Sequence, residues 1–321
     1  MFDLVDVSSL LKRPAVVSRK RIIGPPPGPR VWASADVPDL SELSRRSPQR
    51  AGDLAFRYFC EPHRSERREA GHTFLVRRAR RFLRDARQLA VPSPHGDIPV
   101  YVFEPETAKP IATILVAHGW TSEASFMTLF GERLRHMGAR AVLLDAPAHG
   151  KCKRTRASLV DYTEAVLRVA DAYQPDFALA HSMGCFAVLH AGGGGPPFRR
   201  KYDFKRYVLI GPPNEFGVIT REFADARHMT AAARVTFERH LERIAHRRLS
   251  AFTAAHLLRS ADRPALLLHS RDDHEVPIRH AEEIVAACPT AQLHAFDGMG
   301  HRKILSSPQV VRAAISFLLK T

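Results

Sequence analysis

The sequence predicts an α/β fold in which a mostly parallel central sheet is flanked by helices. From residue 98 onward, short apolar runs alternate with longer amphipathic segments, and turn residues separate them. This alternation is typical of a parallel sheet that helices cover on both faces. Between residues 211 and 260 the rhythm breaks, and apolar positions at helical spacing predict a helical cap insertion. With 321 residues, 45% of them hydrophobic, the chain can bury a large core.

Residues 1–97 differ in character and are expected to form an N-terminal arm and a helical extension, followed by the α/β domain at 98–321. Residues 22–50 contain the run GPPPGP, a composition that favours extended and turn conformations. From residue 51 to 89, apolar side chains recur at helical spacing among many arginines, which predicts two helices. Most of these arginines are expected on solvated helix faces.

The apolar runs of the α/β domain predict its strands and helices, and capping residues mark where two of the helices begin. Ser158 and Asp161 resemble a capping box and mark a helix start, and Ser307 is expected to cap the last helix. Strands are expected at residues 98–103, 111–117, 141–144, 177–180, 207–210, 265–269 and 292–295. Helices are expected at residues 124–137, 158–173, 183–191 and 308–319, with a further one beginning near residue 277.

The chain is strongly basic, with 48 Lys and Arg against 33 Asp and Glu and a formal net charge of +15. Such an excess suits nucleic acid, acidic lipid surfaces or anionic substrates. The basic residues are not interleaved with aromatic ones, however, which argues against nucleic-acid binding. The four cysteines are widely spaced and match neither a metal motif nor a disulfide framework. We therefore expect reduced thiols and no metal.

The expected cellular location rests on the absence of a secretory signal and of a membrane-spanning segment in the sequence. Residues 1–21 place acidic side chains before basic ones and contain no long apolar core, so no secretory signal is predicted. No uninterrupted apolar run approaches the ~20 residues that span a bilayer. We expect a cytoplasmic protein without a membrane span, and the sequence leaves its oligomeric state open.

Ser182 is the candidate nucleophile, in the run AHSMG at residues 180–184 that follows the apolar run at 177–179. A serine between small residues can occupy a strand-to-helix turn too sharp for bulky neighbours, and its hydroxyl is then exposed for attack on a carbonyl. Alanine stands at position 180, where glycine is usual, and keeps that position small.

A serine nucleophile needs a base, a carboxylate that orients the base, and donors for the oxyanion. His301 follows a predicted strand in the run GMGH, whose glycines free the loop, and it has the expected place in the order serine, acid, histidine. Asp272 and Asp273 both follow another strand and are competing candidates for the acid. The backbone N–H groups of Met183 and Trp120 are the expected oxyanion donors.

Together these segments resemble the α/β-hydrolase family, in order, from about residue 98 to the C-terminus. The matching pieces are VAHGW at 116–120, LLDAPAHGK at 143–151, LAHSMGC at 179–185, HSRDDHEVP at 269–277 and GMGHRKIL at 298–305. The resemblance favours Asp273 over Asp272 by its spacing to the Val-Pro pair at 276–277, and it implies that residues 145–150 shape the loop beside the site. The sequence departs from the family pattern at Ala180 and Ser270, where glycine is common, and residues 1–90 lie outside the match.

The function implied is a serine hydrolase that cleaves a carboxylic ester or thioester through an acyl-enzyme, with Ser182, Asp273 and His301 as its triad. No metal or organic cofactor is required, and the partner is a small acyl substrate. Phe216, Phe223 and Phe237 of the insertion are expected to line the acyl site and to favour an uncharged, short-to-medium acyl group. The insertion also carries five arginines, most of which are expected on a solvated helix face, with selection of an acidic substrate as the alternative role: Arg221, Arg227, Arg234, Arg239 and Arg243.

Two other functions compete with this interpretation. One is a non-catalytic binding protein on the same fold, because a fold alone does not determine a function. The other is a module that binds anionic surfaces through its basic N-terminal residues, with hydrolysis as a secondary activity.

Overall fold

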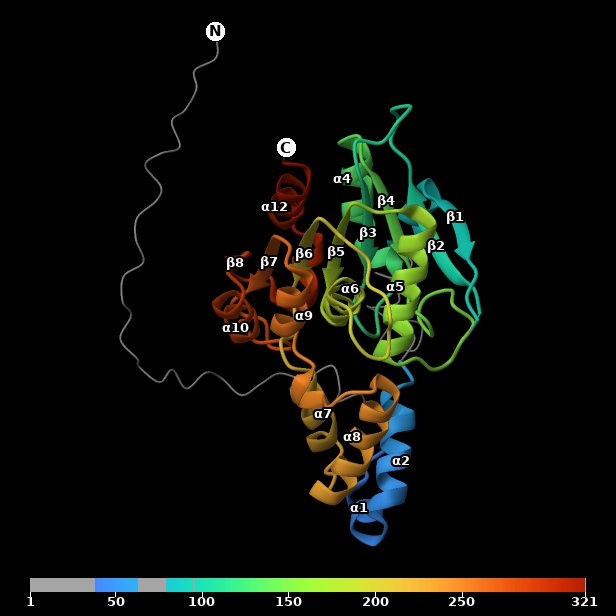
Figure 1. Cartoon of the computed structure of the whole chain (residues 1–321), viewed down its shortest axis with the longest axis vertical. Helices are drawn as coiled ribbons and strands as arrows, with labels where there is room; N and C mark the ends of the chain where they lie inside the picture. The colour runs from blue at the N-terminus through green and yellow to red at the C-terminus, as the bar shows by residue number, and fades with distance from the viewer. Residues whose placement is uncertain (1–37, 63–78, 95, 321) are drawn as a thin grey trace, which may run out of the picture.

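The computed structural model describes residues 38–62, 79–94 and 96–320, and these form one eight-stranded sheet between layers of helices (Figure 1). The strand order is β1-β2-β4-β3-β5-β6-β7-β8. Strands β1, β2 and β4 pair antiparallel, and all later pairs are parallel. The predicted α/β fold with a mostly parallel sheet is confirmed.

The strands lie close to the predicted apolar runs, because both faces of the inner strands are buried and the runs are therefore continuous. One boundary differs: the strand expected from residue 111 begins at Thr113, and the side chain of Ile111 is 66% exposed. The strands are β1 (Arg87–Val91), β2 (Ile98–Phe103), β3 (Thr113–Ala117), β4 (Arg140–Leu144), β5 (Phe177–His181), β6 (Arg206–Ile210), β7 (Ala265–Ser270) and β8 (Ala291–Phe296).

Alternate residues of each inner strand enter two separate cores. In β3, Leu115 and Ala117 join one apolar cluster while Ile114 and Val116 join the other. Helices α4 (Thr128–His136) and α12 (Pro308–Leu319) cover one face of the sheet. The other face is covered by α5 (Leu159–Tyr173), α6 (Met183–Gly193), α9 (Ala254–Ala261) and α10 (Arg279–Ala287).

Local capping agrees with the sequence in part. The Ser158 hydroxyl accepts the Asp161 N–H at 3.2 Å, and the Asp161 carboxylate accepts the Ser158 N–H at 2.7 Å. The predicted capping box of α5 is therefore confirmed. Ser307 is the N-cap of α12, but its side chain makes no capping hydrogen bond.

The sheet begins before the expected position, because β1 pairs antiparallel with β2. The second helix predicted within residues 51–89 is therefore wrong for residues 87–89, which are strand. Only Val91 of β1 is buried, so the run carries no clear periodicity, and pairing with β2 decides its conformation. Residues 63–78 of that prediction lie outside the described residues.

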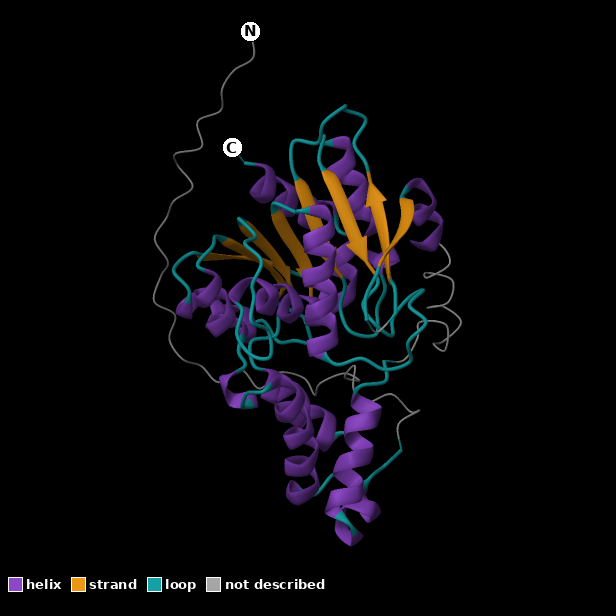
Figure 2. Ribbon diagram, turned by 45° about the vertical axis from the view of Figure 1, so that its right-hand side comes forward, coloured by secondary structure: helices purple, strands orange, loops and turns teal. Residues whose placement is uncertain are grey.

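Two distant parts of the chain build one helical layer beyond the carboxyl ends of the parallel strands (Figures 1 and 2). Helices α1 (Ser41–Arg46) and α2 (Pro48–Phe59) come from the N-terminal part, and α7 (Phe216–Asp225) and α8 (Ala231–Ala245) come from the insertion. At the α2–α8 contact, a Cβ on Gly52 would lie 2.5 Å from Thr236 Cβ, so the close approach requires glycine. Helix α9, also within the predicted insertion, instead packs on α6 over the sheet.

Phenylalanines hold this helical layer together. The Phe59 ring of α2 has its centroid 5.2 Å from those of Phe223 and Phe237 and 6.1 Å from that of Phe216. All four side chains are buried. Helix α2 is thereby fixed to two helices that follow it by more than 150 residues in the chain.

Phe237→Ala is expected to lower the free energy of unfolding by about 3–5 kcal/mol, because it removes a fully buried ring and leaves a cavity. Denaturant unfolding followed by circular dichroism measures the change. Val235→Ala on the same helix is the control, since Val235 is 40% exposed and its truncation should cost less than about 0.5 kcal/mol. Equal losses in both variants would contradict the assignment of Phe237 to this core.

Candidate active site

Ser182 occupies the sharp turn between β5 and α6. Its backbone has φ 53° and ψ −123°, a conformation that costs residues other than glycine about 1–3 kcal/mol and that occurs at nucleophile elbows. A Cβ on Gly184 would lie 2.5 Å from the carbonyl oxygen of His118, so this position requires glycine. Ala180 lies inside strand β5 and has no positive φ, which explains why alanine is accepted there.

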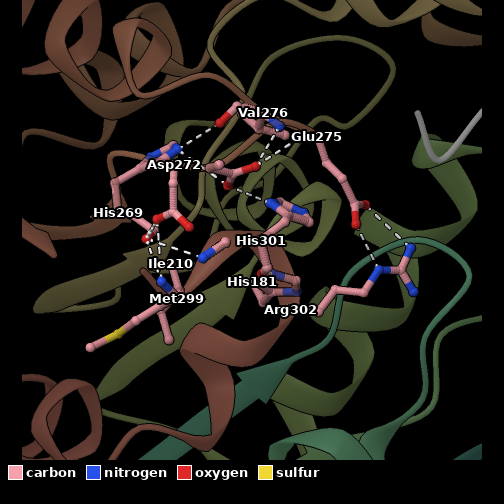
Figure 3. Close-up of polar contacts among 12 residues, drawn as sticks. His181, Ile210, His269, Asp272, Glu275, Val276, Met299, His301 and Arg302 are labelled. Atoms are coloured by element: carbon pink, nitrogen blue, oxygen red, sulfur yellow. Dashed lines mark hydrogen bonds and ion pairs between the residues drawn. The ribbon is translucent and has the colours of Figure 1, made fainter. Parts of the chain in front are cut away.

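His301 is joined to Asp273 at the carboxyl ends of β7 and β8. His301 Nδ1 lies 2.7 Å from Asp273 Oδ2 (Figure 3). The second carboxylate oxygen, Oδ1, accepts the N–H groups of Glu275 at 2.9 Å and Val276 at 2.8 Å. Burial opposes ionisation of Asp273, but hydrogen bonds from His269 and His301 outweigh it and hold its pKa well below the usual range. The structure therefore places Asp273, and not Asp272, against the histidine.

Asp272 instead anchors the loop that carries His301. Its Oδ1 accepts the Ser270 hydroxyl at 2.5 Å and the Met299 N–H at 3.2 Å. The hydroxyl oxygen of Ser270 accepts the N–H groups of Met299 and Gly300, each at 3.2 Å. The hydrogen bond from Ser270 lowers the pKa of Asp272. Ser270, where glycine is common in the family, thus fastens the histidine loop, a contact that the sequence did not reveal.

The loop after β3 lies directly against the elbow. A Cβ on Gly119 would lie 2.9 Å from His181 Nδ1 and 3.1 Å from Ser182 Cβ, so only glycine allows this approach. Trp120 follows it, and Met183 begins helix α6, where the first N–H groups have no carbonyl partner within the helix. The two N–H groups predicted to act as donors therefore come from segments that meet at Ser182.

Buried side chains from two other segments brace this loop. The Tyr162 hydroxyl donates to the His118 carbonyl at 2.8 Å, and His149 Nε2 accepts the Thr121 N–H at 3.1 Å. The His149 ring also meets the Trp120 indole edge-on, with centroids 4.8 Å apart. His149 belongs to the turn that the family resemblance placed beside the site, but its contact with Thr121 was not predicted.

His181 connects the elbow to the histidine loop. Its Nε2 donates to the His301 carbonyl at 2.9 Å, and the two rings have centroids 4.7 Å apart. Burial holds the pKa of His181 well below its usual value, and the neighbouring His301 lowers it further. The ring is therefore neutral, with its proton on Nε2. Position 181 carried no signal in the sequence beyond its place next to the serine.

A cavity of about 770 Å³ opens at these groups. Ser182, His301, Trp120 and Met183 line it, while Asp273 lies behind His301 and is buried. Among the described residues, the Ser182 hydroxyl has no hydrogen-bond partner, and contacts of this kind often tighten only when substrate binds. The structure thus brings together all five residues that the sequence proposed for nucleophile, acid, base and oxyanion donors.

The three phenylalanines expected to bind substrate do not line this cavity, which corrects that prediction. Phe216 and Phe223 lie seven positions apart on one face of α7 and pack with Phe237 on Phe59. The neighbouring face of α7 lines the cavity with Val218, Ile219 and Glu222 instead. Helical spacing identified apolar positions, but only packing shows which face meets α2 and which meets the cavity.

No helix within the described ranges is long and apolar enough to cross a membrane. In the same part of the chain, no group of three or more His, Cys, Asp or Glu side chains is arranged to hold a metal ion. The four cysteines are all free thiols and buried.

Comparison with solved structures identifies similar folds at low sequence identity. A putative lipase from Acinetobacter baumannii is 19% identical, with a TM-score of 0.54 over 77% of this chain and 95% of that chain. A thermophilic esterase from Thermogutta terrifontis is 15% identical, with a TM-score of 0.57 over 74% and 92%. The thioesterase domain from the curacin biosynthetic pathway is 15% identical, with a TM-score of 0.52 over 73% and 99%.

These likenesses show the fold, and sequence comparison shows the family. No curated protein matches the chain by sequence. The sequence profile of the Alpha/beta hydrolase family matches residues 114–314, which is more than half of the chain and spans Ser182, Asp273 and His301. The chain therefore belongs to the α/β-hydrolase family.

Proposed function

We propose that this protein is a serine hydrolase that cleaves a carboxylic ester or thioester through an acyl-enzyme. The observation that carries the proposal is the strained Ser182 turn, which opens onto the same cavity as His301, itself hydrogen-bonded to the ionised Asp273. In this proposal Ser182 is the nucleophile, His301 the base and Asp273 the carboxylate that orients it. The Trp120 and Met183 N–H groups receive the oxyanion.

Acylation begins when the substrate carbonyl binds beside Ser182. His301 Nε2 takes the hydroxyl proton as the serine oxygen attacks the carbonyl carbon, and Asp273 stabilises the resulting imidazolium through Nδ1–H. The carbonyl oxygen becomes an oxyanion held by two N–H donors. Collapse of this intermediate breaks the bond to the leaving group, which takes the proton from His301.

Deacylation repeats the steps with water. His301 takes a proton from a water molecule, the resulting hydroxide attacks the acyl carbonyl, and the oxyanion occupies the same two donors. Collapse releases the carboxylic acid and returns the proton to Ser182. The residues present account for every proton transfer, so the proposed reaction uses no metal or organic cofactor.

The structural neighbours agree with this chemistry. Those described above are named as a putative lipase, an esterase and a thioesterase domain, and these names denote cleavage of oxygen or sulfur esters. At this level of identity they support the reaction class as a proposal and do not select between oxygen and sulfur esters.

Labelling with a fluorophosphonate probe tests the proposal, because the probe reacts with a serine hydroxyl that a neighbouring base activates. We expect one labelled site, located by peptide mass spectrometry at Ser182, and loss of labelling in His301→Ala. Hydrolysis of nitrophenyl acyl esters by the same preparation should disappear in proportion to labelling. An unlabelled protein that still binds esters would be a binding protein on a hydrolase fold and would refute the proposal.

A further inference from the structure

The cavity at Ser182 is much larger than a short acyl group needs. Its volume of about 770 Å³ lies in the upper half of the range, about 300–1,000 Å³, of sites that enclose drug-sized ligands. The helical layer contributes part of its wall through α7, and α4 contributes another part. The space beside the nucleophile is therefore suited to an extended substrate.

The walls of this cavity are largely apolar. They include Phe126 and Leu129 from the α4 side of the sheet, Val218 and Ile219 from α7, and Leu305 from the segment after α11 (Gly300–Lys303). Leu129 and Phe82 are 42% and 48% exposed, and they are two of the six large hydrophobic side chains that the described residues expose. Covering such water-exposed apolar surface with an apolar ligand is favourable, because it removes the surface from water.

The charge of the lining argues against an anionic substrate, although the whole chain carries +15. The described lining residues include three carboxylates, Glu132, Glu222 and Glu275, and two cations, Arg302 and Lys303. Arg302 forms a two-point ion pair with Glu275, at 2.9 and 3.2 Å (Figure 3). The arginines of the insertion that were candidates for acid recognition do not line the cavity, namely Arg221, Arg227, Arg234, Arg239 and Arg243.

From volume, lining and charge together, we propose that the substrate is an uncharged ester of an extended apolar carboxylic acid, and that Leu129 helps to set this specificity. This inference rests on the proposed function of Ser182. It replaces the short-to-medium acyl group expected from the sequence, because the cavity extends past the triad between α4 and α7. A carrier thioester bearing phosphates would meet two cations among the described lining residues, Arg302 and Lys303, and Arg302 is already paired with Glu275.

The test is a series of nitrophenyl esters of acetate, butyrate, octanoate and dodecanoate, together with the hemisuccinate ester, each measured as kcat/KM. Full burial of one methylene is worth about a fourfold gain. We expect kcat/KM to rise through the series, with octanoate at least about tenfold above acetate and dodecanoate at least equal to octanoate, and the hemisuccinate to be the poorest substrate. A flat or falling profile with chain length, or preference for hemisuccinate, would overturn the inference.

Leu129→Glu and Val235→Glu form a matched pair, because both side chains lie on helices and are about equally exposed, at 42% and 40%, but only Leu129 lines the cavity. Leu129→Glu should lower the ratio of kcat/KM for octanoate to that for acetate by about tenfold or more. Val235→Glu should leave the ratio at its wild-type value. Equal ratios in the two variants would show that Leu129 has no part in specificity.

A binding experiment separates failure of this inference from failure of the proposed function. Isothermal titration calorimetry of the Ser182→Ala variant with methyl octanoate and methyl acetate measures the affinity of the cavity for each ester without turnover. We expect binding of the octanoate ester alone over the accessible concentration range. If the variant binds methyl octanoate but the wild type hydrolyses no ester, the proposed function is refuted. If the wild type hydrolyses esters with no preference for the longer acyl chain in binding or rate, only the proposed substrate class is refuted.

Discussion

Ser182→Ala is expected to lower kcat for a nitrophenyl ester by about 10⁶-fold, the scale of losing the nucleophile from a serine–histidine–aspartate set. The structure gives the reason, because Ser182 is the serine held at the strained elbow that shares its cavity with His301. Alanine keeps the Cβ and the same backbone strain, so the fold should be unaffected. Steady-state kinetics and thermal unfolding of the variant measure both parts of the expectation.

Ser260→Ala is the control for this experiment, because Ser260 is an exposed serine on α9 whose hydroxyl only donates to the His256 carbonyl at 2.9 Å. Its activity should equal that of the wild type. If Ser182→Ala kept more than a few per cent of activity in a preparation free of other esterases, Ser182 would not be the nucleophile.

Asp273→Asn should also be strongly damaging, with a loss in kcat of about 10⁴-fold. The Asp273 carboxylate accepts from His301 Nδ1 at 2.7 Å and is 4% exposed. An amide in its place carries no charge to stabilise the imidazolium, and its NH₂ group can favour the wrong histidine tautomer. Since the pKa of Asp273 is held below its usual range, the carboxylate is ionised at neutral pH and the loss should be full there.

Asp272→Asn provides the comparison at the adjacent position. Its Oδ1 accepts the Ser270 hydroxyl and the Met299 N–H, and an asparagine oxygen can accept both bonds. We expect the loss in kcat to stay within about tenfold, because the loop of His301 remains anchored. Both variants are assayed at one pH, and a larger loss in Asp272→Asn would reverse the assignment of the acid.

Much of the fold follows from local signals in the sequence. The inner strands are continuous apolar runs because both of their faces are buried. Ser158 and Asp161 identify the start of α5 because their capping hydrogen bonds form within one helical turn. Strand β1 could not be recognised in this way. Four of its five residues are exposed, so its conformation depends on hydrogen bonds to β2 and leaves no apolar pattern.

The sequence by itself determined the residues able to form the site, because the small neighbours of Ser182, the glycines before His301 and the order of the motifs are local properties. The family spacing favoured Asp273 over Asp272, but only the tertiary structure gives the physical distinction, because the two carboxylates are equal in chemistry until one contacts His301 and the other contacts Ser270. It also decided that Phe216 and Phe223 pack on Phe59, because a helical period reveals an apolar face but not the distant segment that covers it.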